Sequence, residues 1–406
     1  MAATLGLWCH LFGRSQTRVG PSAAPGSPQE SWPRALGPRP DSAAFAWLDA
    51  LPGACWLADA SAREILSASG AAPPAPPLAA VETTHDKAFA AGFASASGYE
   101  PPCLSDLIHS YSPGELAEAD AWLADLRARL ATWPNWTRGR FTLKPRLGSS
   151  GRGRVGGRAD ALEPKKLRAA LPRLARQGGA LLEPWLQRTT DLSVMLHIAP
   201  PAPQGGGEIT LLGAAEQLVA PSGVYAGHLG EVDSRWRVFS GGPFEEAMRE
   251  AAGAIAARAQ QAGYWGPCGI DGFAFNGPEI TDTGSSAPAA PLLRPLVEFN
   301  ARFTVGIVVA GLLRRAANPA GPALGLQPGE RRGFLFALDP PGDWSDWASL
   351  AEATGPGSLL FPLHDPTDRE TMDHEAGGSA ARPALLFAAN AGTLRDALAR
   401  PAGPGA

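Results

Sequence analysis

Strand patterns and helix patterns alternate between residues 81 and 320, and this alternation predicts an α/β (α+β) fold. The predicted strands are the runs "GRFTLKP", "GALLEPWL", "EITLLGAAEQLV", "CGIDGFAFNG" and "LLRPLVEFN". Helical spacing marks "THDKAFAAGFASASG", "SPGELAEADAWLADLRARLATW" and "PFEEAMREAAGAIAARAQQAG". The run "TVGIVVAGLL" is about half as long as a membrane span and lies between Arg302 and Arg314. We therefore expect a buried helix there.

Changes in composition along the chain suggest three parts. At 406 residues, the length suggests roughly two to four domains. The first 80 residues end in "SGAAPPAPPLAA", which is typical of a proline-stiffened connection. After residue 321, "RRGFLFALDP", "GSLLFPLHDP" and "PALLFAAN" are short strand patterns that suggest a small appended α/β unit. We predict domain boundaries near residues 80 and 320.

Charge and cysteine content narrow the class of protein. The formal net charge of −4 gives no overall attraction to polyphosphate or to an anionic membrane, so we expect neither nucleic acid nor membrane as a partner. The four cysteines show no paired spacing of the kind found in zinc sites or disulfide frameworks. "MAATLGLWCHLFGRS" carries its positive charge after its apolar stretch, unlike a secretory signal. A cytoplasmic location is the expectation.

The glycine-rich stretch "KPRLGSSGRGRVGG" (144–157) raises three interpretations: a phosphate-binding loop, a nucleic-acid contact or a flexible linker. A Walker-type loop has its lysine after the glycines, whereas Lys144 precedes them at the end of a predicted strand. The stretch fits instead a strand lysine followed by a glycine hairpin, whose backbone N–H groups can approach phosphate closely. Basic residues without interleaved aromatic residues argue against RNA binding.

Lysine usage favours the phosphate interpretation. Of 35 basic residues only four are lysines: Lys87, Lys144, Lys165 and Lys166. A chain that prefers arginine and keeps lysine beside a glycine-rich loop suggests that a compact ammonium group is needed there. Lys165 and Lys166 are expected on a solvated helix face.

A second group of polar residues lies in "PLVEFNARFTVG". Alternation along a strand directs Glu298 and Asn300 to one face. Asp271, in "CGIDGFAF", lies on the preceding predicted strand, and an antiparallel hairpin would bring it beside them. Oxygen ligands of this kind suit Mg²⁺. The alternative for such a pattern on a strand is an ordinary solvated face.

Five segments in this order along the chain resemble the motifs of the ATP-grasp superfamily: "HDKAFA", "FTLKPRLGSSGRGRVG", "LLEPWLQRTTDLSV", "GIDGFAF" and "VEFNARFTVG". The resemblance covers roughly residues 81–318. It implies an N-terminal α/β pre-ATP-grasp domain (1–80), an ATP-grasp domain (81–320) with a glycine-rich lid at 144–157, and a C-terminal appendage (321–406).

The resemblance also implies roles for individual residues. Nucleotide-binding roles fall on Lys87, Lys144, Gly148, Ser149, Ser150, Gly151, Gly153, Glu183, Pro184, Trp185, Leu186 and Asp191. In this scheme the lysines contact phosphates, residues 183–186 line the adenine pocket, and Asp191 binds the ribose. Asp271, Glu298 and Asn300 would hold the metal, and Arg302 would act with Lys144 on the transferred phosphoryl group. Alternatively, Trp185 is a core residue, Asp191 caps a turn, and His197 and His228 are packed or surface histidines.

The reaction implied by the resemblance is carboxylate–amine ligation with ATP and Mg²⁺, with Mn²⁺ as an alternative ion. ATP-grasp enzymes activate a carboxylate as an acyl phosphate, and an amine or similar nucleophile then displaces phosphate. The expected partners are therefore small-molecule carboxylate and amine substrates. Two alternatives stay open: a phosphotransferase with the same fold, and a nucleotide-binding interaction module without turnover.

Overall fold

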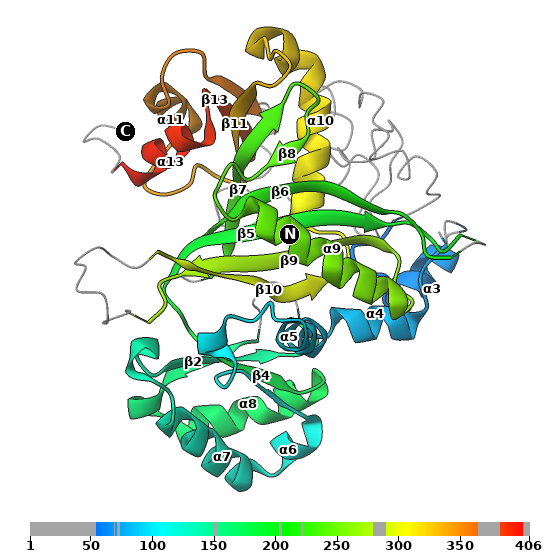
Figure 1. Cartoon of the computed structure of the whole chain (residues 1–406), viewed down its shortest axis with the longest axis vertical. Helices are drawn as coiled ribbons and strands as arrows, with labels where there is room; N and C mark the ends of the chain where they lie inside the picture. Colours follow the sequence, from blue (N-terminus) through cyan, green and yellow to red (C-terminus); the bar gives the residue numbers. More distant parts are fainter. Residues whose placement is uncertain are drawn as a thin grey trace, which may run out of the picture.

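The computed structural model describes residues 54–68, 70, 74–148, 153–202, 205–220, 223–278, 290–363 and 382–400. They form a mixed α/β fold with two β-sheets, one of four strands in the order β1-β4-β2-β3 and one of nine strands in the order β10-β9-β5-β6-β8-β7-β11-β13-β12. The smaller sheet and its helices form a lobe at the bottom of Figure 1, below the nine-stranded sheet.

The small lobe packs three helices against its sheet. Its strands are β1 (His109–Tyr111), β2 (Arg140–Pro145), β3 (Val155–Arg158) and β4 (Ala180–Pro184), and its helices are α6 (Pro113–Ala117), α7 (Ala119–Ala131) and α8 (Pro164–Arg176). Leu126, Leu143, Leu174 and Leu182 belong to the core that joins these layers. The single helix expected over 112–133 is divided at Glu118, whose ψ of 71° interrupts the helical backbone.

The nine-stranded sheet carries most of the apolar core. Its first six strands along the chain are β5 (Arg188–Ile198), β6 (Ile209–Val219), β7 (Tyr225–Asp233), β8 (Val238–Phe239), β9 (Gly266–Phe275) and β10 (Leu292–Asn300). Val194 packs in the core that contains helix α9 (Glu245–Gln261), and its neighbour Met195 packs in the core that contains helix α10 (Val305–Leu324). Because successive strand residues point to opposite faces, α9 and α10 cover opposite faces of the sheet.

The expected buried helix is confirmed as α10, whose residues Ile307 to Ala316 are all buried. No helix among the described residues is long and apolar enough to cross a membrane.

Three helices connect the N-terminal side of the chain to the sheets: α3 (Ala60–Ala68), α4 (Leu78–His85) and α5 (Lys87–Ala96). Asp86 separates α4 from α5, and its side chain caps α5 by accepting a hydrogen bond from the backbone N–H of Ala88. Arg146 binds the same carboxylate through its Nε. Most of the N-terminal domain predicted over 1–80 lies outside the described residues.

The C-terminal residues extend the large sheet. The three strand patterns beyond residue 321 are confirmed as β11 (Arg331–Ala337), β12 (Leu359–Pro362) and β13 (Ala384–Ala388), which are followed or separated by helices α11 (Trp347–Ala353) and α13 (Ala391–Ala399). Strand β11 pairs with β7 in antiparallel register over seven residues. The predicted boundary at residue 320 lies within α10, and strands on both sides of it along the chain pair in one sheet.

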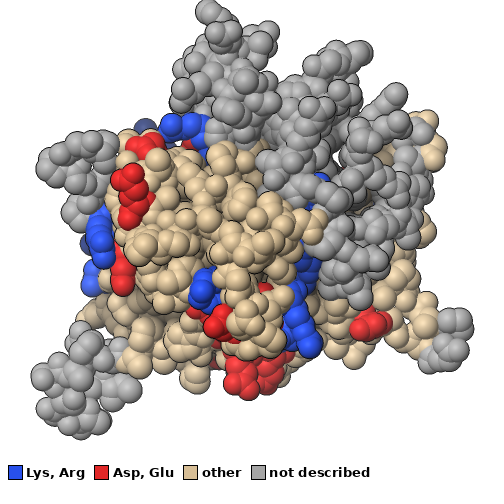
Figure 2. Space-filling model, turned by 90° about the horizontal axis from the view of Figure 1, so that it is seen from above, with Lys and Arg blue, Asp and Glu red and all other residues tan. Residues whose placement is uncertain are grey.

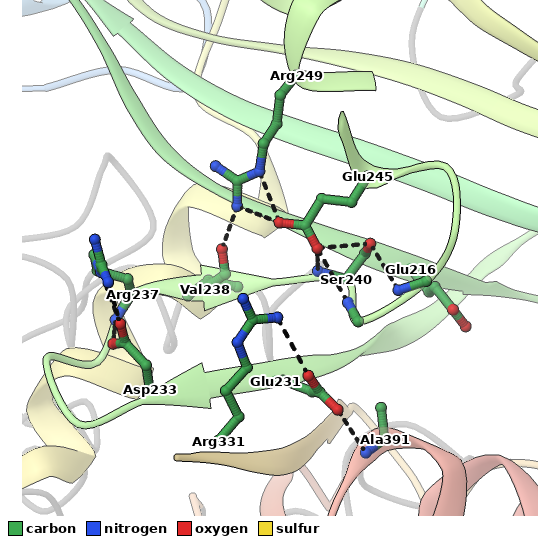
Figure 3. A network of polar contacts seen from close by, with 12 residues as sticks. Glu216, Glu231, Asp233, Arg237, Val238, Ser240, Glu245, Arg249, Arg331 and Ala391 are labelled. Carbon is green, nitrogen blue, oxygen red and sulfur yellow. Dashed lines mark hydrogen bonds and ion pairs between the residues drawn. The ribbon is translucent and has the colours of Figure 1, made fainter. Parts of the chain in front are cut away.

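Polar contacts reinforce this attachment (Figure 3). Glu231 on β7 accepts from Arg331 at 3.5 Å and from the backbone N–H of Ala391 at 3.4 Å. Arg395 on α13 binds the carboxylate of Glu216 and the backbone oxygen of Ser240. The C-terminal segment is thus bonded through side chains to β6 and β7 of the large sheet.

The surface seen from above carries charges of both signs, dispersed among uncharged side chains (Figure 2). On this face the described residues form no large patch of one sign.

Candidate active site

A pair of carboxylates forms the centre of the candidate site. Asp271 on β9 and Glu298 on β10 are directly opposite each other in the antiparallel register. Asn300 donates from Nδ2 to Asp271 Oδ2 at 2.8 Å, and Gln217 on β6 donates from Nε2 to Asp271 Oδ1 at 2.6 Å. The predicted hairpin is therefore present, and it unites the three residues proposed as metal ligands.

Burial and the surrounding charges shift the pKa values of these two carboxyl groups in opposite directions. Burial, reinforced by the negative charge of Glu298, raises the pKa of Asp271 to about 6. Burial would also raise the pKa of Glu298, but the charges of Lys87 and Arg302 outweigh it and lower that pKa. Two acidic groups that face each other in a buried setting create a site that favours a cation.

Two cationic side chains contact this group of residues, Lys87 at Glu298 and Arg302 at Asn300. Lys87, the first residue of α5, is 6% exposed, and its Nζ lies 3.3 Å from Glu298 Oε1. The same Nζ donates to the backbone oxygen of Gly148 at 2.5 Å. Arg302 donates from Nη2 to Asn300 Oδ1 at 2.7 Å. The loop after β2, the start of α5 and the end of β10 therefore meet at one place.

A second buried charge cluster joins the two lobes. Lys144 on β2 pairs with Glu183 on the neighbouring strand β4. Arg294 on β10 pairs with Glu183 at 2.9 Å and with Glu100 at 3.0 Å. Burial would raise the pKa of Glu183, but the positive charges of Lys144 and Arg294 lower it to about 2. If Glu183 lines an adenine pocket, as the sequence resemblance implies, its carboxylate can contact the base only after these ion pairs rearrange.

The predicted adenine segment contains an aromatic ring stacked with arginines. The guanidinium carbon of Arg188 lies 5.1 Å from the ring centre of Trp185 and 4.6 Å from that of Phe273. Arg154 lies 4.5 Å from the same tryptophan ring. Arg188 also pairs with Asp191 at 2.6 Å, so the residue predicted to bind ribose is held by a neighbouring cation. Phe273 is buried, and guanidinium groups lie over both rings, so these contacts are cation–π interactions within the chain.

The other predicted residues divide between described and undescribed positions. Pro184 and Leu186 are buried beside Trp185, whose backbone N–H donates to the oxygen of Arg140. The backbone oxygen of Gly153 accepts from Arg173 at 2.8 Å. Ser149, Ser150 and Gly151 lie outside the described residues. His197 and His228 are both buried.

Sequence reasoning missed four polar residues of these clusters: Glu100, Arg188, Gln217 and Arg294. Gln217 lies within a predicted strand, but its partner Asp271 is on another strand. Arg188 and its partner Asp191 are both on β5, which was not among the predicted strands. Arg294 was detectable as a charge inside the apolar run "LLRPLVEFN", because a charged residue is seldom fully buried without a partner. Glu100 follows a helix by four residues and gave no signal of its own.

The donor set at the carboxylate pair fits a divalent cation that prefers oxygen. It comprises two carboxylates and one amide, and burial, together with the charge of Glu298, raises the pKa of Asp271. Among the described residues, no group of three or more His, Cys, Asp and Glu side chains could hold a metal ion by itself.

No family model and no curated protein matches the sequence. Solved structures do resemble the chain. One is an N5-carboxyaminoimidazole ribonucleotide synthetase from Thermus thermophilus, 18% identical over 85% of this chain and 78% of that chain, with a TM-score of 0.45. A biotin carboxylase–β-γ-ATP complex from Campylobacter jejuni is 13% identical over 80% and 67%, with a TM-score of 0.43. An L-amino acid ligase from Bacillus licheniformis is 13% identical over 82% and 75%, with a TM-score of 0.41.

All three are ATP-grasp enzymes, the superfamily that the sequence resembles. At TM-scores below 0.5 these similarities carry no argument about chemistry, which depends on the side chains of this chain.

Proposed function

We propose that this protein is an ATP-dependent ligase that activates a carboxylate as an acyl phosphate and joins it to an amine or a similar nucleophile. The observation that carries the proposal is the convergence of Asp271 on β9 and of Glu298 and Asn300 on β10 with two cationic side chains, Lys87 and Arg302. Phosphoryl transfer depends on positioning and on neutralisation of charge, and this set offers both.

In the proposed site, Asp271, Glu298 and Asn300 hold the divalent cation. When bound, Mg²⁺ neutralises phosphate oxygens and helps to orient the polyphosphate. Lys87 and Lys144 bind phosphates by exchanging their present carboxylate partners for phosphate oxygens. Glycine at 148 and 153 lets the backbone approach those oxygens closely.

We assign to Arg302 the contact with the transferred phosphoryl group. It bonds Asn300 through Nη2, so its guanidinium lies beside the metal-binding amide. The substrate carboxylate oxygen forms a bond to the γ-phosphorus while the bond between that phosphorus and the bridging oxygen of ADP breaks. The amine nitrogen then attacks the acyl carbon, loses a proton, and phosphate departs with the electrons of the C–O bond. Exclusion of water protects the acyl phosphate between these steps.

Hydroxylamine trapping tests the proposal. The protein is incubated with ATP, Mg²⁺, hydroxylamine and pools of small carboxylic acids and amino acids, and hydroxamate and ADP are both assayed. A ligase yields hydroxamate and ADP with one pool, and Arg302→Ala abolishes both. A phosphorylated alcohol without hydroxamate would identify a kinase instead. ATP binding without ADP from any pool would contradict an enzymatic role and favour a nucleotide-binding module.

A further inference from the structure

An apolar cavity lies beside the candidate active site. Its volume is about 370 Å³, at the small end of the range of roughly 300–1,000 Å³ that ligand pockets occupy. Its wall comes from the segment before and within α3, from the residues that lead into β9, and from the connection between β10 and α10. Large apolar side chains dominate the wall, among them Trp56, Tyr264, Trp265 and Phe303.

Arg302 is common to the cavity and to the carboxylate centre. It lines the cavity, and its Nη2 bonds Asn300, which in turn bonds Asp271. The buried Nε of Arg302 has no hydrogen-bond partner among the described residues. A buried donor without a partner is costly, so this nitrogen is suited to an acceptor that a ligand supplies.

The remaining titratable groups of the wall leave Arg302 as the group that would recognise charge. Arg63 is engaged in positioning its own segment, because its Nε donates to Ala58 O and its Nη2 to Pro76 O. Burial lowers the pKa of His197 to about 4, so this imidazole is neutral at pH 7. Burial also raises the pKa of Cys55, which keeps its thiol protonated.

The absence of acidic groups is equally informative. No Asp or Glu is among the described residues that line the cavity. A ligand with an ammonium group in this cavity would lack a carboxylate partner, and burial of such a charge without a partner is strongly unfavourable. The wall therefore suits a ligand that carries one negative charge and a compact apolar body.

We propose that this cavity holds the apolar part of a small monocarboxylic acid, with its carboxylate accepting hydrogen bonds from Arg302. The inference rests on the proposed function and names the class of acid that the site activates: aryl or branched aliphatic acids without an α-amino group. In this position the carboxylate lies on the side of Arg302 that adjoins Asn300 and Asp271.

Direct binding tests this assignment without requiring turnover. Calorimetric titration of the full chain without ATP compares 3-phenylpropanoate and 4-methylpentanoate with their primary amides and with phenylalanine and leucine. At least one acid is expected to bind, and its amide and the matching amino acid should bind at least about tenfold more weakly. Arg302→Gln should reduce the affinity for the acid to that for its amide.

Filling the cavity supplies the matched control. Ala58→Trp places a large side chain in the wall and should weaken acid binding at least about tenfold, whereas Ala60→Trp, on an exposed position of α3 outside the wall, should leave it unchanged. Circular dichroism of both variants checks folding. Ala58→Gly enlarges the cavity and should retain acid binding, which provides a second test at this position if Ala58→Trp does not fold.

The outcomes separate this inference from the proposed ligase activity. Equal binding of phenylalanine and 3-phenylpropanoate, no binding of any acid at millimolar concentration, or indifference of a folded Ala58→Trp variant would overturn it. Acid binding that follows the pattern above, without hydroxamate formation, would support the cavity assignment and refute the ligase. Hydroxamate formation that is unchanged by Ala58→Trp would support the ligase activity and refute the cavity assignment.

Discussion

Lys87 and Glu298 form an ion pair at 3.3 Å, between the first residue of α5 and a residue near the end of β10. Because Lys87 also donates to Gly148 O, it connects the carboxylate centre to the end of the segment that carries Lys144. If a phosphate oxygen replaces Glu298 as the partner of the Lys87 ammonium group, the Glu298 carboxylate becomes free to bind a cation. Nucleotide binding and metal binding would then be coupled.

Lys87→Met is therefore expected to weaken ATP binding by about tenfold or more, because it removes a charge-assisted contact to phosphate. Calorimetric titration with ATP and Mg²⁺ measures the change. Lys165→Met is the control, since Lys165 is exposed on α8, away from this contact. Equal affinities in the two variants would argue against phosphate binding by Lys87.

Arg294 is expected to be a major source of stability, because it neutralises Glu183 and Glu100 where all three side chains are at least 95% buried. Arg294→Met leaves an excess of buried negative charge and should lower the free energy of unfolding by about 3–5 kcal/mol. Urea denaturation provides the measurement. Arg331→Met, at a side chain 44% exposed, should cost less than about 1 kcal/mol.

Partner substitution keeps that prediction testable. Arg294→Met combined with Glu183→Gln and Glu100→Gln removes the unmatched charges and should recover part of the loss. If the triple variant is no more stable than Arg294→Met, the cost comes from packing instead of charge.

The sequence predicted local structure better than charge pairing. The strands that carry Asp271 and Glu298 were predictable because apolar alternation and the adjacent loop imply a hairpin, and one correct register brings both carboxylates together. The pairing of Arg294 with Glu183 joins residues 111 positions apart on different sheets, and no local pattern encodes it. Helix α4 was not predicted, and Asp86, which lies inside the predicted run "THDKAFAAGFASASG", ends α4 and caps α5.

The C-terminal strands illustrate the same limit at larger scale. Their existence follows from short apolar runs, but their partner does not. Strand β11 pairs with β7, about a hundred residues earlier, so the segment is separate in sequence and continuous with the sheet in space. Long-range strand order is fixed by packing that single-sequence patterns do not record.

Acid should destabilise the protein through its buried histidines. Burial lowers the pKa of His228 to about 3 from an ordinary value of 6.5, so the unfolded chain binds more protons between these values. The stability that depends on neutral His228 is fully present above about pH 6.5 and is lost as pH falls toward about 3, by at most about 5 kcal/mol.

Urea denaturation at pH 7 and pH 4.5 measures this slope. His228→Leu should lose less stability on acidification than the unmodified protein, although His85 and His197, whose pKa values burial also lowers to about 4, keep part of the effect. Tyr225→Phe is the control: it removes the contact of Tyr225 with His228 Nδ1 but keeps the imidazole, so the acid sensitivity should persist. A slope unchanged in His228→Leu would show that His228 is not the titrating group.

Glu298→Gln is expected to weaken divalent-cation binding and to abolish ADP release while leaving the protein folded. The substitution keeps the size of the side chain and removes one of the two facing negative charges, so the cation loses its strongest electrostatic attraction. Mn²⁺ binding, followed by electron paramagnetic resonance in the presence of ATP, reports on the site independently of turnover. Chelation of the metal should likewise stop ADP release.

Glu246→Gln, at an exposed position in the first turn of α9, is the matched control and should leave Mn²⁺ affinity unchanged. Mn²⁺ bound equally well by the Glu298→Gln variant and by the unmodified protein would mean that the carboxylate pair of β9 and β10 is not the metal site.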